Sequence, residues 1–467
     1  MRQHFLRQLL QLAAAALVLY LLFALLSFIL QPLFAHRTPA AGLTGPKAQP
    51  NTEQVLCIDD NTDALLWRLR AIEAAQENIT LSTFQLGTLH SGMDMLAALQ
   101  AAAQRGVQVR LIIDGGLNAR SLTGNDLFQA LASTPGVEIR FYNPISLLRP
   151  WQANYRLHDK YLIVDDNAFL SGGRNIGDLF LGDYIPKDKQ NVDRDLLVWR
   201  PDATVPGLQD TLKEHFEEVW ALPTNQTKSR PGKAAEKEAQ KLAARYDALK
   251  ETYPELKEKI NFEAETLPVN GIQLLTGPNK PENKAPELWY ALRQRMLTGE
   301  DVVIQTPYII CNKAMYQDLS ELCEDGRKVC IITNAVENGA NPFGCTDYLN
   351  NRKKILKTGC EVYEHTSIFS IHAKTILVDD RWSIVGSYNL DIRSTYLNSE
   401  MMLAVDSPEL NAQLRQDFEK QAQESLRVEP DGTETAGSEY APAPMGLFKK
   451  LLYALLRLIT LPIRHLL

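Results

Sequence analysis

The chain has 467 residues, of which 45% are hydrophobic and 22% are charged. This length exceeds what one ordinary core needs and allows two domains with additional segments, and the composition excludes a mostly disordered protein. The formal net charge of -7 excludes the overall basic excess with which nucleic-acid-binding proteins neutralise a polyphosphate backbone. None of the six cysteines has C-x-x-C spacing, so the sequence does not indicate a zinc site.

The N-terminal segment is predicted to be a membrane anchor. Residues 8–35 contain no charged side chain, and residues 12–30 are apolar except for Ser27; about 20 such helical residues cross a hydrocarbon core. A cleaved signal peptide is the alternative, but its hydrophobic region is only about 7–15 residues long. Arg2 and Arg7 precede the span and Arg37 follows it, a bias that places the body outside the cytoplasm. We therefore expect a cytoplasmic tip and a single-pass anchor in the cell membrane at residues 1–36, followed by a linker at residues 37–54.

Residues 55–225 alternate strand and helix patterns, as is typical of a layered α/β protein. The predicted elements are strands at residues 78–86, 107–114 and 137–142 and helices at residues 62–76 and 93–105. Residues 263–426 repeat this order. Their predicted elements are strands at residues 302–310, 329–333 and 362–364 and helices at residues 285–296 and 313–323. An internal duplication is the simplest explanation, so we expect two similar halves.

Two segments have the composition of connections. Residues 226–262 are dominated by Lys, Glu, Ala and Gln, with both signs of charge at helical spacing. They are predicted to form a solvated helical connector between the halves. Residues 427–445 are rich in Pro, Gly, Glu and Ala and are predicted to be a linker.

Residues 446–467 are predicted to form an amphipathic helix. Lys450, Arg457 and Arg464 follow one another at seven-residue steps, which drift by only about 20° per step on a helix and so form one stripe. The remaining apolar face suits a helix that lies in a membrane interface with anionic lipids. Docking on the body of the protein is the alternative, but the preceding linker favours the membrane surface.

Two segments of nineteen residues, 157–175 (LHDKYLIVDDNAFLSGGRN) and 371–389 (IHAKTILVDDRWSIVGSYN), share their polar frame. Each has a histidine, a lysine two residues later, an aspartate five residues after the lysine and an asparagine ten residues beyond the aspartate. These residues are His158, Lys160, Asp165 and Asn175 in the first copy and His372, Lys374, Asp379 and Asn389 in the second. Since the chain has only eight histidines, two in matching frames indicate a function.

Paired copies of this frame suit attack on a phosphodiester. One imidazole can act as the nucleophile while the other protonates the departing alkoxide. The lysines and asparagines would supply positive charge and donors to the crowded phosphate, so no metal is required. A carboxylate commonly orients such an imidazole, and we expect Glu400 and Asp195, which follow the two copies, to do so.

These segments resemble the paired H-K-D signatures of the phospholipase D superfamily, including a G-S-x-N at Gly386, Ser387 and Asn389. The resemblance covers roughly residues 55–425. It implies two α/β/α sandwich halves about a pseudo-twofold axis, with His158 and His372 meeting at the interface as the catalytic pair. It also implies that the motif lysines and the two motif aspartates belong to the catalytic signature, with the aspartates bracing the motif. Asn175, Ser387 and Asn389 are implied to bind the substrate phosphate. The first copy departs from the pattern with Gly173 where Ser is usual.

Residues 172–180 (GGRNIGDLF) and 306–308 (TPY) are similar to bacterial cardiolipin synthases, particularly the C type. This resemblance implies phosphatidyl transfer between phospholipids through a phosphohistidine intermediate, without a cofactor. Phosphatidylglycerol is the implied substrate, with phosphatidylethanolamine as an alternative. The resemblance leaves open whether a partner protein is required.

Three other functions are compatible with the same class of fold. They are a phospholipase D-type hydrolase that releases phosphatidic acid, a nuclease, and a non-catalytic membrane adaptor. The apolar and amphipathic ends favour a lipid substrate, and the acidic body disfavours nucleic acid. An adaptor would have one motif degraded, whereas both motifs are complete.

Overall fold

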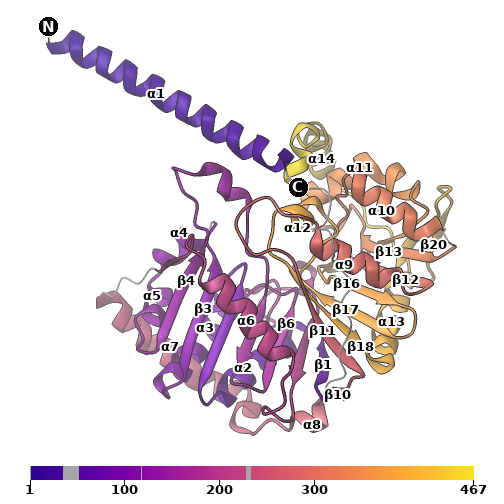
Figure 1. Ribbon diagram of the computed structural model, residues 1–467, viewed down its shortest axis with the longest axis horizontal. Helices are drawn as coiled ribbons and strands as arrows, with labels where there is room; N and C mark the ends of the chain where they lie inside the picture. The colour runs from indigo at the N-terminus through magenta and orange to yellow at the C-terminus, as the bar shows by residue number, and fades with distance from the viewer. Residues whose placement is uncertain (1, 35–51, 117, 228–232, 325) are drawn as a thin grey trace.

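The computed structural model describes residues 2–34, 52–116, 118–227, 233–324 and 326–467. Its body holds two nine-stranded mixed sheets side by side, one built almost entirely from each half of the chain (Figure 1). The order β1-β8-β6-β5-β2-β3-β4-β9 in the first sheet is repeated as β11-β18-β17-β16-β12-β13-β14-β19 in the second. The predicted duplication is therefore confirmed at the level of topology.

The first sheet is covered by helices that follow or precede its parallel strands. Its strands are β1 (Gln54–Ile58), β2 (Asn78–Thr83), β3 (Gln108–Asp114), β4 (Val137–Tyr142), β5 (Tyr161–Val164), β6 (Ala168–Gly172), β8 (Asp195–Trp199), β9 (Gln226–Thr227) and β10 (Leu267–Pro268). The helices are α2 (Asn61–Ala74), α3 (His90–Gln104), α4 (Asn118–Thr123), α5 (Asp126–Ala132), α6 (Leu208–Trp220) and α7 (Lys233–Thr252).

The second sheet has the same arrangement, preceded by the short helix α8 (Phe262–Glu265). Its strands are β11 (Gly271–Thr276), β12 (Asp301–Gln305), β13 (Lys328–Asn334), β14 (Glu361–His365), β16 (Thr375–Val378), β17 (Trp382–Gly386), β18 (Met401–Asp406), β19 (Ser425–Val428) and β20 (Glu434–Ala436). The helices are α9 (Glu287–Met296), α10 (Lys313–Glu324), α11 (Pro342–Leu356), α12 (Ile392–Tyr396) and α13 (Pro408–Gln423).

A shared hydrophobic core joins the two halves. Phe169 of the first sheet and Leu403 of the second belong to one buried cluster, together with Phe216 of α6 and Leu414 of α13. Each half also has a separate core beneath its outer helices. Because side chains of both sheets fill the space between them, the halves are held in one fixed relation, as the positioning of a site at their interface requires.

Two predicted connections are corrected by the structure. Residues 226–262 do contain a helix, but α7 packs on α3 and α5 of the first half and buries Leu242, Tyr246 and Leu249, so it is not a solvated connector. The apolar residues of α7 recur at helical spacing and form a face that packs on the first half, whereas the prediction of a solvated helix rested on the charged residues around them. Residues 427–445 are not a simple linker, since β20 pairs with β19 and extends the second sheet.

The N-terminal helix α1 (Arg2–Leu30) projects away from the body beside the C-terminal helix α14 (Leu447–Ile459) (Figure 1). Residues 4–34 are long and apolar enough to cross a membrane, and the most apolar part is not buried in the protein. The predicted linker at residues 37–54 lies outside the described residues except for its last three. The apolar helix thus agrees with the predicted anchor, while the side of the membrane on which the body lies stays a prediction.

The predicted amphipathic helix at the C-terminus is present, and it docks on α11. Tyr453 is buried, Arg464 pairs with Asp347 at 2.5 Å, and Arg457 donates to Asn350 at 2.8 Å. Arg457 and Arg464 of the cationic stripe therefore contact the protein, as the docking alternative expected, while Lys450 is exposed; contact of this helix with lipid stays a prediction. The opposite face exposes leucines, among them Leu447, Leu451, Leu455 and Leu458.

Candidate active site

Each motif forms a hairpin whose histidine and lysine precede the first strand. Asp165 and Asp379 lie at the opposite end, in the turns that follow β5 and β16, with positive φ values of 47° and 49°. Asp165 accepts three backbone N–H bonds, from residues 76–78, at 2.8–2.9 Å, and Asp379 accepts two, from Glu300 and Asp301. Both aspartates brace the hairpins, so their place in the catalytic signature is structural.

Short parallel bridges between the halves position the histidines. The strand β15 (Ser370–Ile371) pairs with β7 (Asn191–Val192), and the N–H of His372 donates to the carbonyl of Val192 at 2.7 Å. On the other side of the interface, the N–H of His158 donates to the carbonyl of Ser399 at 2.9 Å. Each histidine is therefore fixed by the backbone of the opposite half, directly before an acidic residue of that half.

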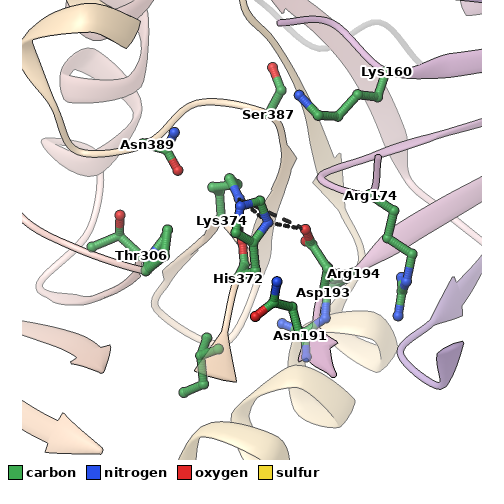
Figure 2. Close-up of polar contacts among 12 residues, drawn as sticks. Lys160, Arg174, Asn191, Asp193, Arg194, Thr306, His372, Lys374, Ser387 and Asn389 are labelled. Carbon is green, nitrogen blue, oxygen red and sulfur yellow. Dashed lines mark hydrogen bonds and ion pairs between the residues drawn. The ribbon is translucent and has the colours of Figure 1, made fainter. Parts of the chain in front are cut away.

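In this arrangement each histidine is paired with a carboxylate of the other half. Nδ1 of His158 lies 2.8 Å from Oε2 of Glu400. Nδ1 of His372 lies 2.5 Å from Oδ2 of Asp193, the pair that Figure 2 shows. All four side chains are buried or nearly so. An ionised carboxylate only accepts hydrogen bonds, so Nδ1 carries the proton in each ring and the Nε2 lone pair remains for chemistry.

Asp193, and not Asp195, is the partner of the second histidine. Asp195 is fully buried and pairs instead with Arg68 at 2.9 Å and Arg174 at 3.1 Å. The register explains the error, because Gly172 faces Asp195 while the equivalent Gly386 faces Met402, two residues after Glu400. Aligning the apolar runs of β8 and β18 would have identified Asp193.

Ser387 does not serve the predicted phosphate site in this structure. Its hydroxyl donates to Glu400 at 2.6 Å and accepts from the N–H of Met401, so it holds the carboxylate that holds His158. In the first half, a Cβ at Gly173 would lie 2.2 Å from Oδ1 of Asp193. The departure from the usual serine therefore makes room for the other carboxylate.

Burial shifts the pKa values of the paired histidines and of Glu400. It lowers the pKa of His372 to about 4, assisted by the charge of Lys374, and it lowers the pKa of His158 against the opposing charge of Glu400. Burial opposes ionisation of Glu400 as well, but the charge and hydrogen bond of His158 outweigh it and bring its pKa to about 2. Both imidazoles are consequently neutral at pH 7 when no phosphate is bound.

Two buried lysines supply the positive charge. Lys160 donates to the carbonyl of His158 at 2.6 Å, and burial lowers its pKa to about 7. The Nζ atom of Lys374 lies 2.7 Å from Nδ1 of His372 and 3.4 Å from its Nε2. Burial also lowers the pKa of Lys374. Figure 2 shows that Lys160 and Lys374 approach the site from different halves.

The two asparagines keep polar atoms available. The Oδ1 atoms of Asn175 and Asn389 are buried and have no hydrogen-bond partner among the described residues. As acceptors these oxygens suit a donor such as a substrate hydroxyl, while the Nδ2 groups of the same carboxamides can donate to phosphate oxygens. Two aromatic neighbours of the histidines were not predicted, because no spacing in the sequence relates them to the motifs. Phe84 contacts the ring of His158 at a centroid distance of 5.1 Å, and Phe180 contacts that of His372 at 4.9 Å. These rings exclude water from the imidazoles.

Two histidine–lysine motifs that meet across a repeated α/β sandwich define a protein of the phospholipase D class. The family model described as "Cardiolipin synthase, PLD-like domain" matches residues 69–220 and 293–422, which is more than half of the chain. The chain therefore belongs to this family, and the predicted superfamily is confirmed.

Several relatives cover most of the chain. It is 29% identical over 392 residues to cardiolipin synthase C of Escherichia coli K12, covering 76% of this chain and 81% of the relative. It is 29% identical over 358 residues to the major cardiolipin synthase ClsA of Bacillus subtilis 168, covering 74% and 64%. The crystal structure of a phosphatidylserine synthase from Haemophilus influenzae Rd KW20 matches with a TM-score of 0.60 at 18% identity, covering 88% of this chain and 96% of that one. This last likeness shows the fold.

Proposed function

We propose that the protein makes cardiolipin by transferring a phosphatidyl group from one phospholipid to the headgroup alcohol of another, through a covalent phosphohistidine. The observation that carries this proposal is the reciprocal exchange of carboxylates, Glu400 on His158 and Asp193 on His372. It presents two Nε2 atoms of the same kind to one space between the halves, as a two-step displacement at phosphorus requires.

In the first step one Nε2 attacks the phosphorus of the donor, and the bond from phosphorus to the headgroup oxygen breaks. The other imidazole, protonated, gives its proton to that departing oxygen. In the second step the acceptor hydroxyl gives its proton to the same imidazole, its oxygen attacks phosphorus, and the P–N bond breaks. The two lysines and the two asparagines stabilise the negative charge on the phosphate oxygens.

We assign the attack to His158 and the proton transfers to His372. Lys374 lies close to both ring nitrogens of His372, and a neighbouring ammonium makes an imidazolium a stronger proton donor. The anionic phosphodiester, once bound, offsets burial and allows His372 to take up its proton. Phosphatidylglycerol would then be the donor, and a second phosphatidylglycerol or a phosphatidylethanolamine the acceptor.

The ends of the chain support a lipid substrate. The end of the apolar helix α1 contacts the C-terminal segment, where Nε2 of His465 lies 2.7 Å from the carbonyl oxygen of Ile29. Helix α14, which has exposed leucines, lies at this same end of the molecule (Figure 1). A membrane holding α1 would therefore meet the exposed face of α14, and the body would lie at the lipid surface.

Lipid analysis of a cardiolipin-deficient bacterium that expresses the chain tests the proposal. Cardiolipin should form with the intact protein and not with the His158→Ala or His372→Ala variants. With purified unaltered protein and donor labelled in the phosphate, rapid denaturation during turnover should trap an acid-labile label on His158. Phosphatidic acid in place of cardiolipin would instead identify a hydrolase, and a label trapped on His372 would reverse the assignment of the two histidines.

A further inference from the structure

The two halves differ beside the motif asparagines: the first half has two glycines there, next to a cavity, where the second half has larger side chains. Backbone bonds establish the equivalence: the N–H of Gly87 donates to the carbonyl of Ile176, and the N–H of Ile310 donates to that of Leu390. Gly87 thus corresponds to Ile310, which is buried. By the spacing from the motif asparagines, Gly177 corresponds to Asp391, whose carboxylate accepts from the N–H of Ser394.

The glycines of the first half border a cavity of about 490 Å³. A side chain at Gly177 would meet nothing within 4 Å at its first carbon. The walls are largely apolar, with Leu86, Leu122, Ile176 and Phe180 among them. Two leucines of this lining are exposed, Leu89 by 70% and Leu179 by 46%. This volume lies in the range of about 300–1,000 Å³ that is usual for ligand sites.

The cavity adjoins residues that lie next to the paired histidines. Asn175, whose buried Oδ1 atom has no partner among the described residues, is part of its lining. Phe180 forms another part of the wall and contacts the ring of His372. A phosphate between the two histidines would therefore be continuous with a group that fills the cavity.

A neighbouring cavity lies between the first one and the loop that contacts α1. A second cavity, of about 760 Å³, shares Ser121 of α4 with the first and extends to Ile145. Ile145, Leu147 and Leu148 are all more than half exposed, and the carbonyl of Leu147 accepts a hydrogen bond from Tyr20 of α1 at 2.6 Å. The exposed apolar residues of this loop thus lie between the candidate span and α4, whose Ser121 borders both cavities.

We propose that this cavity binds an acyl chain of one phospholipid substrate, so that the first half selects a lipid by its tail while the paired histidines act on its phosphate. The proposal rests on the phosphatidyl transfer proposed above. The occupant is apolar because the lining is apolar, and it is attached to a phosphodiester because the cavity ends at Asn175.

Photolabelling tests the cavity without turnover. Full-length His158→Ala protein in phosphatidylcholine vesicles receives a phosphatidylglycerol that carries a diazirine at mid-chain, and the labelled peptides are mapped by mass spectrometry. Label should appear within residues 85–89 and 176–180, and adding Gly177→Leu, which fills the cavity, should reduce it by about tenfold, since each methylene displaced changes affinity by about fourfold. Label confined to α1 and α14 would overturn the proposal.

Kinetics separate this proposal from the function on which it rests. Two variants of otherwise unaltered protein are compared: Gly177→Leu in the cavity and Leu179→Gln at its exposed rim. Each should lower kcat/KM for the long-chain donor dioleoyl-phosphatidylglycerol by about tenfold or more. Each should leave kcat/KM for the short-chain donor dibutyroyl-phosphatidylglycerol within about twofold of the unaltered value. Equal effects on the two donors in both variants would overturn the acyl site alone. An unaltered protein that binds the photoprobe in the cavity but forms no product from either donor would refute only the phosphatidyl transfer.

Discussion

Replacement of Asp193 by Asn should lower kcat by about two to four orders of magnitude. The carboxylate lies 2.5 Å from Nδ1 of His372 and 3.8 Å from Nζ of Lys374 in a buried site. A hydrogen bond to a charged group contributes about 1.5–3 kcal/mol, which alone corresponds to a factor of roughly 10 to 150. The amide can also present its N–H₂ to Nδ1 and so hold the wrong tautomer, and the equivalent change in the serine-protease triad lowers kcat by about 10⁴.

Asp195→Asn is the matched control for this prediction, because it makes the same chemical change two residues away. Asp195 contacts Arg68 and Arg174 and neither histidine, so its replacement should lower the free energy of unfolding by about 3–5 kcal/mol and leave kcat per folded molecule nearly unchanged. Turnover of phosphatidylglycerol and thermal unfolding of both variants measure the two effects. A large loss of kcat in Asp195→Asn, with Asp193→Asn near normal, would refute the assignment of the orienting carboxylate.

Three further outcomes are expected. Asp165→Ala should reduce thermal stability by about 2–4 kcal/mol, because three backbone N–H groups lose their acceptor, but kcat measured on folded protein should change little; a selective loss of kcat would contradict the bracing role. The ratio kcat/KM should fall more steeply as pH rises through about 7, since burial places the pKa of Lys160 there and its ammonium is present below that pH and lost above it; this loss adds to the gradual decline above about pH 4 that the required protonation of His372 causes. Lys160→Arg should move this alkaline limb upward, and an unmoved limb would assign it to another group. Replacing the exposed leucines Leu451, Leu455 and Leu458 by Ser should reduce labelling of α14 by a bilayer-confined carbene probe by about fivefold or more, whereas an unlabelled α14 in the unaltered protein would show that this face does not meet lipid.

Most of the fold could be predicted because the two halves of the chain repeat the same order of strands and helices. The alternating patterns located β3, β4, α9 and α10 within a few residues, and β2 was predicted too long, since the chain leaves the sheet after Thr83 and Phe84 then contacts His158. The prediction that residues 226–262 form a solvated connector was wrong, because the many charged residues outnumber the few apolar ones that form the buried side of α7. Whether such a side is covered depends on α3 and α5, which are distant in sequence.

The sequence by itself determined the duplicated frame, and with it the histidines, lysines, asparagines and bracing aspartates, because local spacing fixes which side chains a hairpin presents together. Glu400 could be proposed from its place after the second copy, but Asp193 could not be separated from Asp195 by counting, since the loop after Gly172 is longer than the one after Gly386. Only the tertiary structure decided which carboxylate meets which histidine. The reason is physical: each pair is made across the interface, where the backbone of one half bonds to the residue before the acid of the other, and no periodicity within one half records that contact.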